Sequence, residues 1–449
     1  MARLRRVMGG THVTKTQAKR QTLWWHRDFL LLWSGQTVSD IGSAVTVLAL
    51  PLIAVSLLGA STFEVGALSA SGTVAYLLVA LPAGALVDRT VKHHLMIWSN
   101  AGRAVVLAGV PLAATLSHLS MAQLYVTALV AGMLTAVFEI AYQSYLPTLI
   151  RRDQLVEGNG KIGITNSLSE VIGPSLAGGL ASLLSSAAYA VTADCLSFVI
   201  SIVSLLLIRT PEPPPRANGS RKTIGKQIAE GVRYVARHTV LRRVVACATM
   251  SSLFNMTLMT VLVVFLVRTL HASAGTTGLL LGLGSAGGVV GAFTVGPLSR
   301  LIGSARMFWA GKLFLGGFAL LIPLAGPGWG VVLVSVGLCA TTASVVMFNV
   351  SQVSYRQAVC PPELLGRMNA TMRWAIRGAK PIGGLLGGVL GDWIGLRETL
   401  FMAALGSWLA VLFIVLSPIR YLRDIPLHEA YAEKAPEPAA LATELRAKR

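Results

Sequence analysis

The stretch AYQSYLPTLIRRDQLVEGN, at residues 141–159, is echoed 210 positions later by SQVSYRQAVCPPELLGRMN, at residues 351–369. Shortly afterwards, GPSLAGGL at 173–180 is echoed by KPIGGLLGGVL at 380–390. One such match can arise by chance, whereas a run of matches followed by similar glycine- and proline-rich segments indicates an internal repeat. The matched positions within the first pair of stretches are Tyr145 and Tyr355, Asp153 and Glu363, Leu155 and Leu365, and Asn159 and Asn369.

The composition indicates a membrane protein. Of the 449 residues, 54% are hydrophobic and 13% are charged, whereas a soluble domain typically carries about 25% charged residues. Twelve apolar runs approach the ~20 residues that a helix needs to cross a bilayer. We therefore expect an all-α polytopic membrane protein with 12 transmembrane helices in two pseudo-symmetric six-helix bundles. The runs lie near 29–58, 63–87, 95–116, 122–145, 160–184, 187–208, 244–267, 276–298, 307–325, 329–353, 370–391 and 399–418.

The positive charge has a topological pattern. The formal net charge is +19, which by itself would be compatible with nucleic-acid binding. However, 31 of the 38 Lys and Arg residues fall in the tails and in alternate loops, and the opposite loops hold only Arg268 and Arg397. This asymmetry follows the rule that cytoplasmic loops are rich in Lys and Arg. It predicts cytoplasmic N- and C-termini and argues against a nucleic-acid partner.

The longest polar segment, at 209–243, divides the chain. It opens with the proline-rich stretch RTPEPPPRANGSRK, after which Ile224, Ile228, Val232 and Val235 recur at helical spacing. This pattern predicts an amphipathic helix on the cytoplasmic surface. The predicted organisation is a cytoplasmic tail at 1–28, a six-helix bundle at 29–208, the linker at 209–243, a second bundle at 244–418 and a cytoplasmic tail at 419–449.

Several site classes have no support in the sequence. A GxGxxG pattern from Gly282 to Gly287 lies inside an apolar run with no preceding strand, so it favours close helix packing over nucleotide binding. A near-match to a phosphate loop at 219–227 lacks the required Ser or Thr, so ATP-driven transport has no support. The histidines show no metal-ligand spacing, and the four dispersed cysteines predict free thiols. No nucleophile–base arrangement suggests an enzyme.

One connector carries spaced charges. GALVDRTVKHH begins at Gly84 and includes Asp88, Arg89 and Lys92. It resembles the signature between helices 2 and 3 of the major facilitator superfamily, although a valine and a histidine replace a glycine and a second basic residue of that pattern. The corresponding second-half stretch, GPLSRLIGSAR, has lost the acid, and a Ser-Arg pair beginning at Ser299 stands in its place.

Three further stretches resemble one branch of that superfamily. They are RDFLLLWSGQTVSDIGSAVTVLALP at 27–51, FEIAYQSYLP from 138 and NVSQVSYRQ from 349. They are similar to the bacterial drug:proton antiporters, with macrolide-efflux-like and enterobactin-exporter-like proteins, over residues 27 to 426. Two parallel six-helix repeats fit the architecture of these transporters.

The resemblance implies an efflux transporter of the bacterial inner membrane, of the kind that gives multidrug resistance. It implies proton antiport by alternating access, an amphipathic small-molecule substrate such as a drug, an antibiotic or a siderophore, and a monomer without a cofactor. An importer or facilitator of a small metabolite would share the fold, because fold does not fix function. A non-transporting receptor or scaffold is a more remote alternative.

Two sets of motif residues have both a functional and a structural interpretation. The resemblance implies that Gly84, Asp88, Arg89, Lys92 and Glu139 gate the cytoplasmic side; the alternative is an ordinary charged turn. It also implies that a proline-bent, glycine-rich segment forms a pivot between the two halves; the alternative is simple helix packing. The residues of this second motif are Ser169, Gly173, Pro174, Gly178 and Gly179.

Charged residues inside membrane helices are costly and are candidates for function. Asp40, followed by Glu170, is the candidate proton-coupling site. Asp194 is expected to be a structural partner, and Arg103 is a further base within a span. The alternative for the other charges is permanent structural pairing. The candidate substrate-cavity residues are Gln36, Asn255, Asn349, Gln352, Arg377 and Lys380.

Overall fold

The computed structural model describes residues 23–151, 154–184, 186–212, 224–360 and 362–424. Within these ranges the chain is helical and has no strand. The first half contains α1 Arg27–Ser56, α2 Thr62–Arg89, α3 Lys92–Thr115, α4 Met121–Leu149, α5 Leu155–Leu183 and α6 Ala187–Leu206. After α7 Ile224–Arg237, the second half contains α8 Thr239–Arg268, α9 Ala274–Ile302, α10 Ser304–Phe314, α11 Val332–Val359, α12 Pro362–Trp393, α13 Leu396–Leu409 and α14 Leu412–Val415.

Short 3₁₀ segments complete two of the long helical runs. The segment η3 Gly316–Leu324 extends α10, and η4 Gly328–Val331 leads into α11. Two others flank the bundle, η1 Leu23–Trp25 and η5 Pro418–Tyr421. With these, each of the twelve expected spans corresponds to a helical run. Among the described residues, ten runs are long and apolar enough to cross a membrane. The runs α5 and α12 are not among the ten, because acids, bases and glycines dilute their apolar residues.

The two halves begin alike, which supports the internal repeat. Both α1 and α8 have 30 residues, and a histidine caps each of them. The ring of His26 accepts a hydrogen bond from the backbone N–H of Phe29, and the ring of His238 accepts one from that of Leu241. These caps satisfy N–H groups that the first turn of a helix leaves free.

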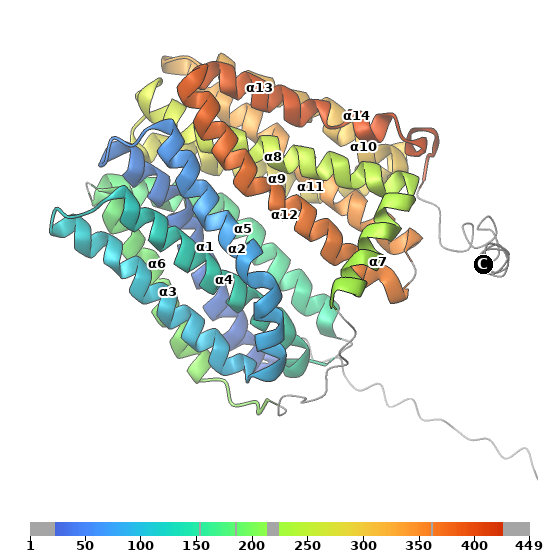
Figure 1. Cartoon of the computed structure of the whole chain (residues 1–449), viewed down its shortest axis with the longest axis horizontal. Coiled ribbons are helices and arrows are strands. Elements are labelled where there is room, and N and C mark those ends of the chain that lie inside the picture. The colour runs from blue at the N-terminus through green and yellow to red at the C-terminus, as the bar shows by residue number, and fades with distance from the viewer. Residues whose placement is uncertain (1–22, 152–153, 185, 213–223, 361, 425–449) are drawn as a thin grey trace, which may run out of the picture.

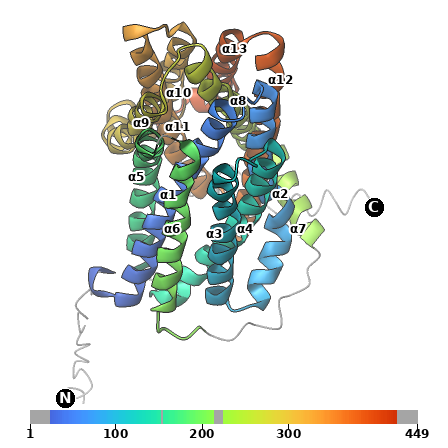
Figure 2. The same cartoon turned by 90° about the vertical axis from the view of Figure 1, so that its left-hand side faces the viewer.

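The helices form two groups that meet along a few helix pairs. Helices α1–α6 lie together, with α8–α14 beside them (Figures 1 and 2). The main contacts between the groups join α5 to α9 and α2 to α12. We call the end where α1 begins and α14 ends the terminal face, and the end where α1 leads into α2 the distal face. The fold is thus the expected all-α arrangement of two related bundles.

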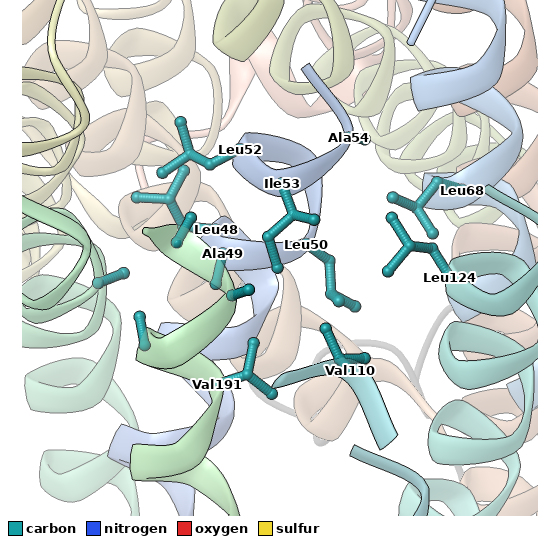
Figure 3. Close-up of a cluster of buried hydrophobic side chains, with 14 of the residues drawn as sticks. Leu48, Ala49, Leu50, Leu52, Ile53, Ala54, Leu68, Val110, Leu124 and Val191 are labelled. Carbon is teal, nitrogen blue, oxygen red and sulfur yellow. The ribbon is translucent and has the colours of Figure 1, made fainter. Parts of the chain in front are cut away.

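The first bundle has a large apolar core toward the distal face. Side chains from the second half of α1 meet those of α2, α3, α4 and α6 there (Figure 3). Burying these side chains holds the bundle together even though its outer surface is also apolar. The labelled members of this cluster are Leu48, Ala49, Leu50, Leu52, Ile53, Ala54, Leu68, Val110, Leu124 and Val191.

The linker contains the expected helix, α7, which packs against α12 and α8. Val235 is buried, whereas Val232 is exposed. A Cβ added at Gly231 would lie 2.8 Å from the carbonyl oxygen of Arg367, so α7 lies close against α12. The side chains of Ile224 and Ile228, the stretch 213–223, and nearly all of both predicted tails lie outside the described residues.

Candidate substrate cavity and charge network

A cavity of about 450 Å³ lies mainly within the first half and extends to the second. Its wall is mostly apolar and small, and it includes five charged side chains. Its lining residues are Ser43, Thr46, Val47, Leu50, Pro51, Leu68, Ser69, Gly72, Thr73, Tyr76, Arg103, Leu107, Ala128, Ala131, Gly132, Thr135, Glu139, Asp194, Phe198, Met256, Arg377 and Lys380. Such a wall suits a ligand with a large apolar body and a few polar groups.

Arg103 of α3 is the most deeply buried cation of the wall, with 3% of its surface exposed. Its guanidinium donates to Asn100 Oδ1 and, at 3.4 Å, to Thr135 Oγ1. The guanidinium carbon lies 4.7 Å from the ring centre of Phe138 and 4.3 Å from that of Phe198. Two aromatic faces and two polar oxygens thus hold the cation where water cannot solvate it freely.

Asp194 of α6 is 1% exposed and is held by hydroxyl groups. Thr46 Oγ1 donates to one carboxylate oxygen at 2.6 Å, and Ser197 Oγ and Ser43 Oγ donate to the other at 3.1 and 3.4 Å. The carboxylate also interacts electrostatically with Arg103. Asp194 was expected to be a structural partner; the structure adds that it lines the cavity.

Asp40 lies on the same side of α1 as Ser43 and Thr46. The side-chain amide of Gln36 donates to its carboxylate at 2.6 Å. Asp40 is half-buried and interacts electrostatically with Arg103. Arg103 thus interacts electrostatically with acids from three helices, Asp40 of α1, Glu139 of α4 and Asp194 of α6.

A third acid joins the two halves. Glu139 of α4 forms an ion pair with Arg377 of α12 at 3.4 Å. The Arg377 guanidinium carbon also lies 3.8 Å from the ring centre of Tyr76 in α2. Lys380, one turn further along α12, interacts electrostatically with Glu170 of α5. Arg377 and Lys380 thus bring positive charge from the second half to the cavity wall.

Lys92 of the gating motif has an ion-pair partner in the linker. The ammonium group of Lys92 pairs with Glu212 at 2.8 Å, and Glu212 also accepts from the backbone N–H groups of Lys92 and His93, both at 3.1 Å. A linker carboxylate therefore caps the start of α3, where it complements the helix dipole.

The remaining residues of that gating motif are only partly visible. The Asp88 side chain lies outside the described residues. Arg89 is exposed, and a Cβ added at Gly84 would have no neighbour within 4 Å. Among the described residues, no atom therefore packs closely against Gly84.

The glycines of the helix-5 motif make close contacts with two different helices. A Cβ at Gly173 would collide with Ala44 of α1, and a Cβ at Gly178 would lie 2.8 Å from the Cα atom of Gly278 in α9. Ser169 is buried, and its hydroxyl donates to the backbone of its own helix. By contrast, a Cβ at Gly179 would have no neighbour within 4 Å. The motif thus allows α5 to approach both its own half and the other half.

Charged side chains tie the two halves together at the distal face. Asp392, near the end of α12, accepts hydrogen bonds from the backbone N–H groups of Thr62 and Phe63 at 3.0 and 2.9 Å. Arg268, at the end of α8, donates to the carbonyl oxygens of Gly59, at 3.1 Å, and Ala60. These contacts and the glycine junctions join the two halves on the distal side.

Four predicted cavity residues lie elsewhere. Gln36 bonds Asp40, as described above, and Gln352 donates to Asn349 at 2.6 Å. Gln36, Asn349, Gln352 and Asn255 are not among the described residues that line the 450 Å³ cavity. Their contact with cargo stays a prediction. Conversely, sequence reasoning did not place Arg103, Asp194 or Tyr76 in the cavity, although a charge within an apolar run was a usable signal for the first two.

The apparent nucleotide motif and the cysteines have structural explanations. Cβ atoms at Gly282, Gly284 and Gly287 of α9 would collide with α5 or α11, so these glycines serve helix packing. The four cysteines, which all lie among the described residues, form no disulfide; Cys247 and Cys360 are buried and the other two are half-buried. Among the described residues, no group of three His, Cys, Asp or Glu side chains could hold a metal ion.

Known proteins with the same organisation are transporters. A family model described as the Major Facilitator Superfamily matches residues 32–379 and 245–448. Macrolide efflux protein A of Streptococcus pyogenes is 23% identical over 406 residues, which cover 90% of this chain and 98% of that protein. Enterobactin exporter EntS of Escherichia coli (strain K12) is 25% identical over 411 residues, which cover 89% and 94%.

A solved structure shows the same fold. The nucleoside transporter NupG superposes with a TM-score of 0.69 at 12% identity, covering 87% of this chain and 98% of its own. The resemblance seen in the sequence is thereby confirmed, and the chain is a multi-pass membrane transporter, not an enzyme. Because the family model covers well over half of its residues, this chain belongs to the Major Facilitator Superfamily.

Proposed function

We propose that this protein exports an amphipathic small molecule from a bacterial cell in exchange for protons. The observation that supports this most is the cavity itself, whose mostly apolar wall carries the buried Asp194 and Arg103 and whose Glu139–Arg377 pair joins the two halves. An apolar wall tolerates varied hydrophobic cargo, and carboxylates in such a place can take up and release protons. The names of the two relatives, a macrolide efflux protein and an enterobactin exporter, support export.

In this proposal the terminal face lies in the cytoplasm and the protein sits in the inner membrane. The concentration of 31 of 38 Lys and Arg residues in the tails and alternate loops supports this orientation. The distal contacts of Asp392 and Arg268 then lie on the outward side of the membrane, where they join the two halves. The two bundles, at 29–208 and 244–418, alternate as a monomer around the cavity, without a cofactor and without ATP.

Each motif has a role in this cycle. Asp40 is the main proton-coupling candidate, with Glu170 as the second. The segment from Ser169 to Gly179 serves as the pivot, because its glycines bring α5 against both α1 and α9. Gly84, Asp88, Arg89 and Lys92 close the cytoplasmic side when the distal side opens, with Glu139 held deeper in the cavity by Arg377.

An importer or facilitator of a small metabolite remains the second candidate, since NupG carries nucleosides on the same fold. Proton exchange separates the two. An antiporter moves cargo and protons in opposite directions, whereas a symporter moves them in the same direction and a facilitator moves no protons. A scaffold or receptor would move neither.

The test uses everted bacterial membrane vesicles that contain the full chain and have an acidified lumen. Erythromycin and a catecholate siderophore serve as probes, followed by a wider panel of antibiotics. We expect at least one probe to enter the vesicles while the lumen becomes less acidic, and we expect Asp40→Asn to abolish this coupling. If no probe moves protons and Asp40→Asn leaves transport unaltered, proton antiport is wrong.

A further inference from the structure

Three of the five charged side chains in the cavity wall have surface to offer to cargo. Asp194 and Arg103 are 1% and 3% exposed, so they offer almost none. By contrast, the side chains of Glu139 and Arg377 are 40% and 35% exposed, and Lys380 is exposed as well. The accessible charge of the wall is therefore two cations and one carboxylate, with a net positive sign.

Glu139 uses only part of the hydrogen-bonding capacity of Arg377. Both terminal nitrogens of the guanidinium reach the same oxygen, Glu139 Oε2, each at 3.4 Å. Strong hydrogen bonds of this kind are about 2.7–3.2 Å long, and a guanidinium pairs best with two oxygens of one acid. The contact of the guanidinium with the ring of Tyr76 uses no N–H group. An acid that presents two oxygens can thus bind Arg377 better than Glu139 does.

Lys380 faces the same stretch of α2 as Arg377 does. Arg377, Lys380 and Gly384 follow one another at intervals of three and four residues, which places them on one side of α12. The outer two positions touch α2, because Arg377 lies over Tyr76 and a Cβ at Gly384 would lie 3.4 Å from the Cβ atom of Ser69. Lys380 therefore lies beside α2 between Ser69 and Tyr76, and all three line the cavity.

The ammonium group of Lys380 has room for a ligand. In the part of the chain that the structure describes, it forms no ion pair, although Glu170 and Glu139 interact with it electrostatically. A cation in a mostly apolar wall is costly without a close counter-charge. Two cations one turn apart, one bonded to a single oxygen and one without an ion pair, match an anionic group in the cavity.

We infer that the cargo carries an oxyanion, such as a carboxylate or a sulfonate, on an apolar body, and that Arg377 and Lys380 bind this oxyanion. The apolar body lies against the apolar part of the wall. The oxyanion competes with Glu139 for Arg377, so cargo binding breaks an ion pair that joins α4 of the first half to α12 of the second. The inference rests on the proposed export and names the class of its cargo.

The experiment compares two fluorescent probes that differ in one group. Anilinonaphthalene sulfonate carries an oxyanion on an apolar body, and phenylnaphthylamine is the same body without it. Both are titrated at neutral pH against the purified full chain in nanodiscs of zwitterionic lipid, without a proton gradient and with empty nanodiscs as background. The quantity measured is the ratio of the sulfonate affinity to the neutral-probe affinity, in which the contribution of the apolar body cancels.

We expect Arg377→Gln and Lys380→Gln each to lower this ratio about tenfold, because each removes a charged hydrogen-bond donor from the oxyanion alone. Lys380→Arg should keep the wild-type ratio, since it keeps the charge. Glu139→Gln should raise the ratio, because the competitor for Arg377 is gone. The matched control is Arg367→Gln, which removes the same charge from the same helix; Arg367 pairs with Glu230 of α7, and the ratio should stay unchanged.

Three outcomes would overturn the oxyanion site. They are a wild type without saturable sulfonate binding, a ratio that Arg377→Gln or Lys380→Gln leaves unchanged, and an equal fall in Arg367→Gln. Should one variant fail to fold, which loss of neutral-probe binding would reveal, the other and Glu139→Gln decide. If the ratios change as expected while vesicles show no cargo-linked proton flux, the oxyanion site stands and the proposed antiport fails. If the flux is present and the ratios do not change, the antiport stands and this cargo class is wrong.

Discussion

Gly178 of α5 and Gly278 of α9 touch where the two halves meet. A Cβ atom placed on either glycine would lie 2.8 Å from the Cα atom of the other. No side chain can be accommodated at such a distance unless the two backbones separate, so this junction depends on glycine on both sides. Helices of different halves are thus in direct backbone contact near the distal face.

Gly178→Ala should therefore oppose closure of the distal side. Overpacking a tight contact costs about 1–3 kcal/mol, which would change the ratio of the two conformations at least about fivefold. The measurement is labelling of a single cysteine, Ser69→Cys in the cavity wall of a chain freed of its other cysteines, by a membrane-impermeant maleimide added at the distal side. Labelling should become faster. The matched control is Gly179→Ala, which has open space around it; equal rates in the two variants would contradict the prediction.

Asp392→Ala should weaken the same closure by a different route. Asp392 accepts from two backbone N–H groups at the start of α2, so its loss removes a cap contributed by the other half. Loss of such a cap costs about 1 kcal/mol, again close to a fivefold change in the conformational ratio. In the Ser69→Cys assay, Asp392→Ala should therefore speed up labelling from the distal side. Asp392→Asn should speed it up less, because the amide oxygen can still accept a hydrogen bond and keeps part of the cap. An unchanged rate in Asp392→Ala would mean that the distal contact is incidental.

Much of this architecture is present in the sequence. Apolar runs of bilayer length, the distribution of Lys and Arg, and the repeat around Tyr145 and Tyr355 were sufficient to predict two helical bundles. They suffice because the lipid environment demands long apolar helices, and because cytoplasmic loops are rich in Lys and Arg. Glycine patterns in α5 and α9 also predicted close packing, although not which glycine meets which helix.

The charge pairs were predicted less well, for a physical reason. Which acid meets which base depends on helix rotation and on contacts between distant segments, and neither is encoded in local spacing. Lys92 pairs with Glu212 of the linker, 120 residues further along the chain. Glu139 was assigned to the terminal-face cluster, yet it reaches Arg377 of the other half.

The Glu139–Arg377 pair should behave as one unit in transport. Both side chains are about one third exposed or more, so the pair contributes no more than about 1 kcal/mol. Glu139→Gln and Arg377→Gln should each reduce the initial rate of cargo uptake, and the double variant should be no slower than the slower single variant, because each change breaks the same contact. Losses that multiply in the double variant would show instead that the two residues act independently.

Asp88→Asn should impair transport while membrane insertion and expression remain normal. The acid belongs to the only copy of the connector motif that retains one, since its second-half counterpart carries Ser299 and Arg300. Substitution at Ser299, for instance Ser299→Asn, should therefore have little effect on the same uptake assay. If both variants transport at the wild-type rate, the stretch from Gly84 to Lys92 is a charged connector and not a gate.

Glu212 should stabilise the protein in a pH-dependent way. Burial acts to raise the pKa of this carboxyl, but the hydrogen bonds from Lys92 and from the backbone N–H groups of His93 and Lys92 outweigh it and hold the pKa below its usual value. A pKa that is lower in the folded than in the unfolded chain contributes stability above the unfolded value of about 4.3, and this contribution is lost as the pH falls through the folded pKa. Glu212→Gln should thus lower the thermal unfolding midpoint of the purified protein at pH 7, and the difference from wild type should shrink as the pH falls below about 4.

Glu230→Gln is the control: Glu230 also pairs with a base, Arg367, but its side chain is 53% exposed, against 5% for Glu212. A difference between Glu212→Gln and wild type that stayed constant from pH 7 to pH 3 would show that the ionised carboxylate is not what holds the start of α3.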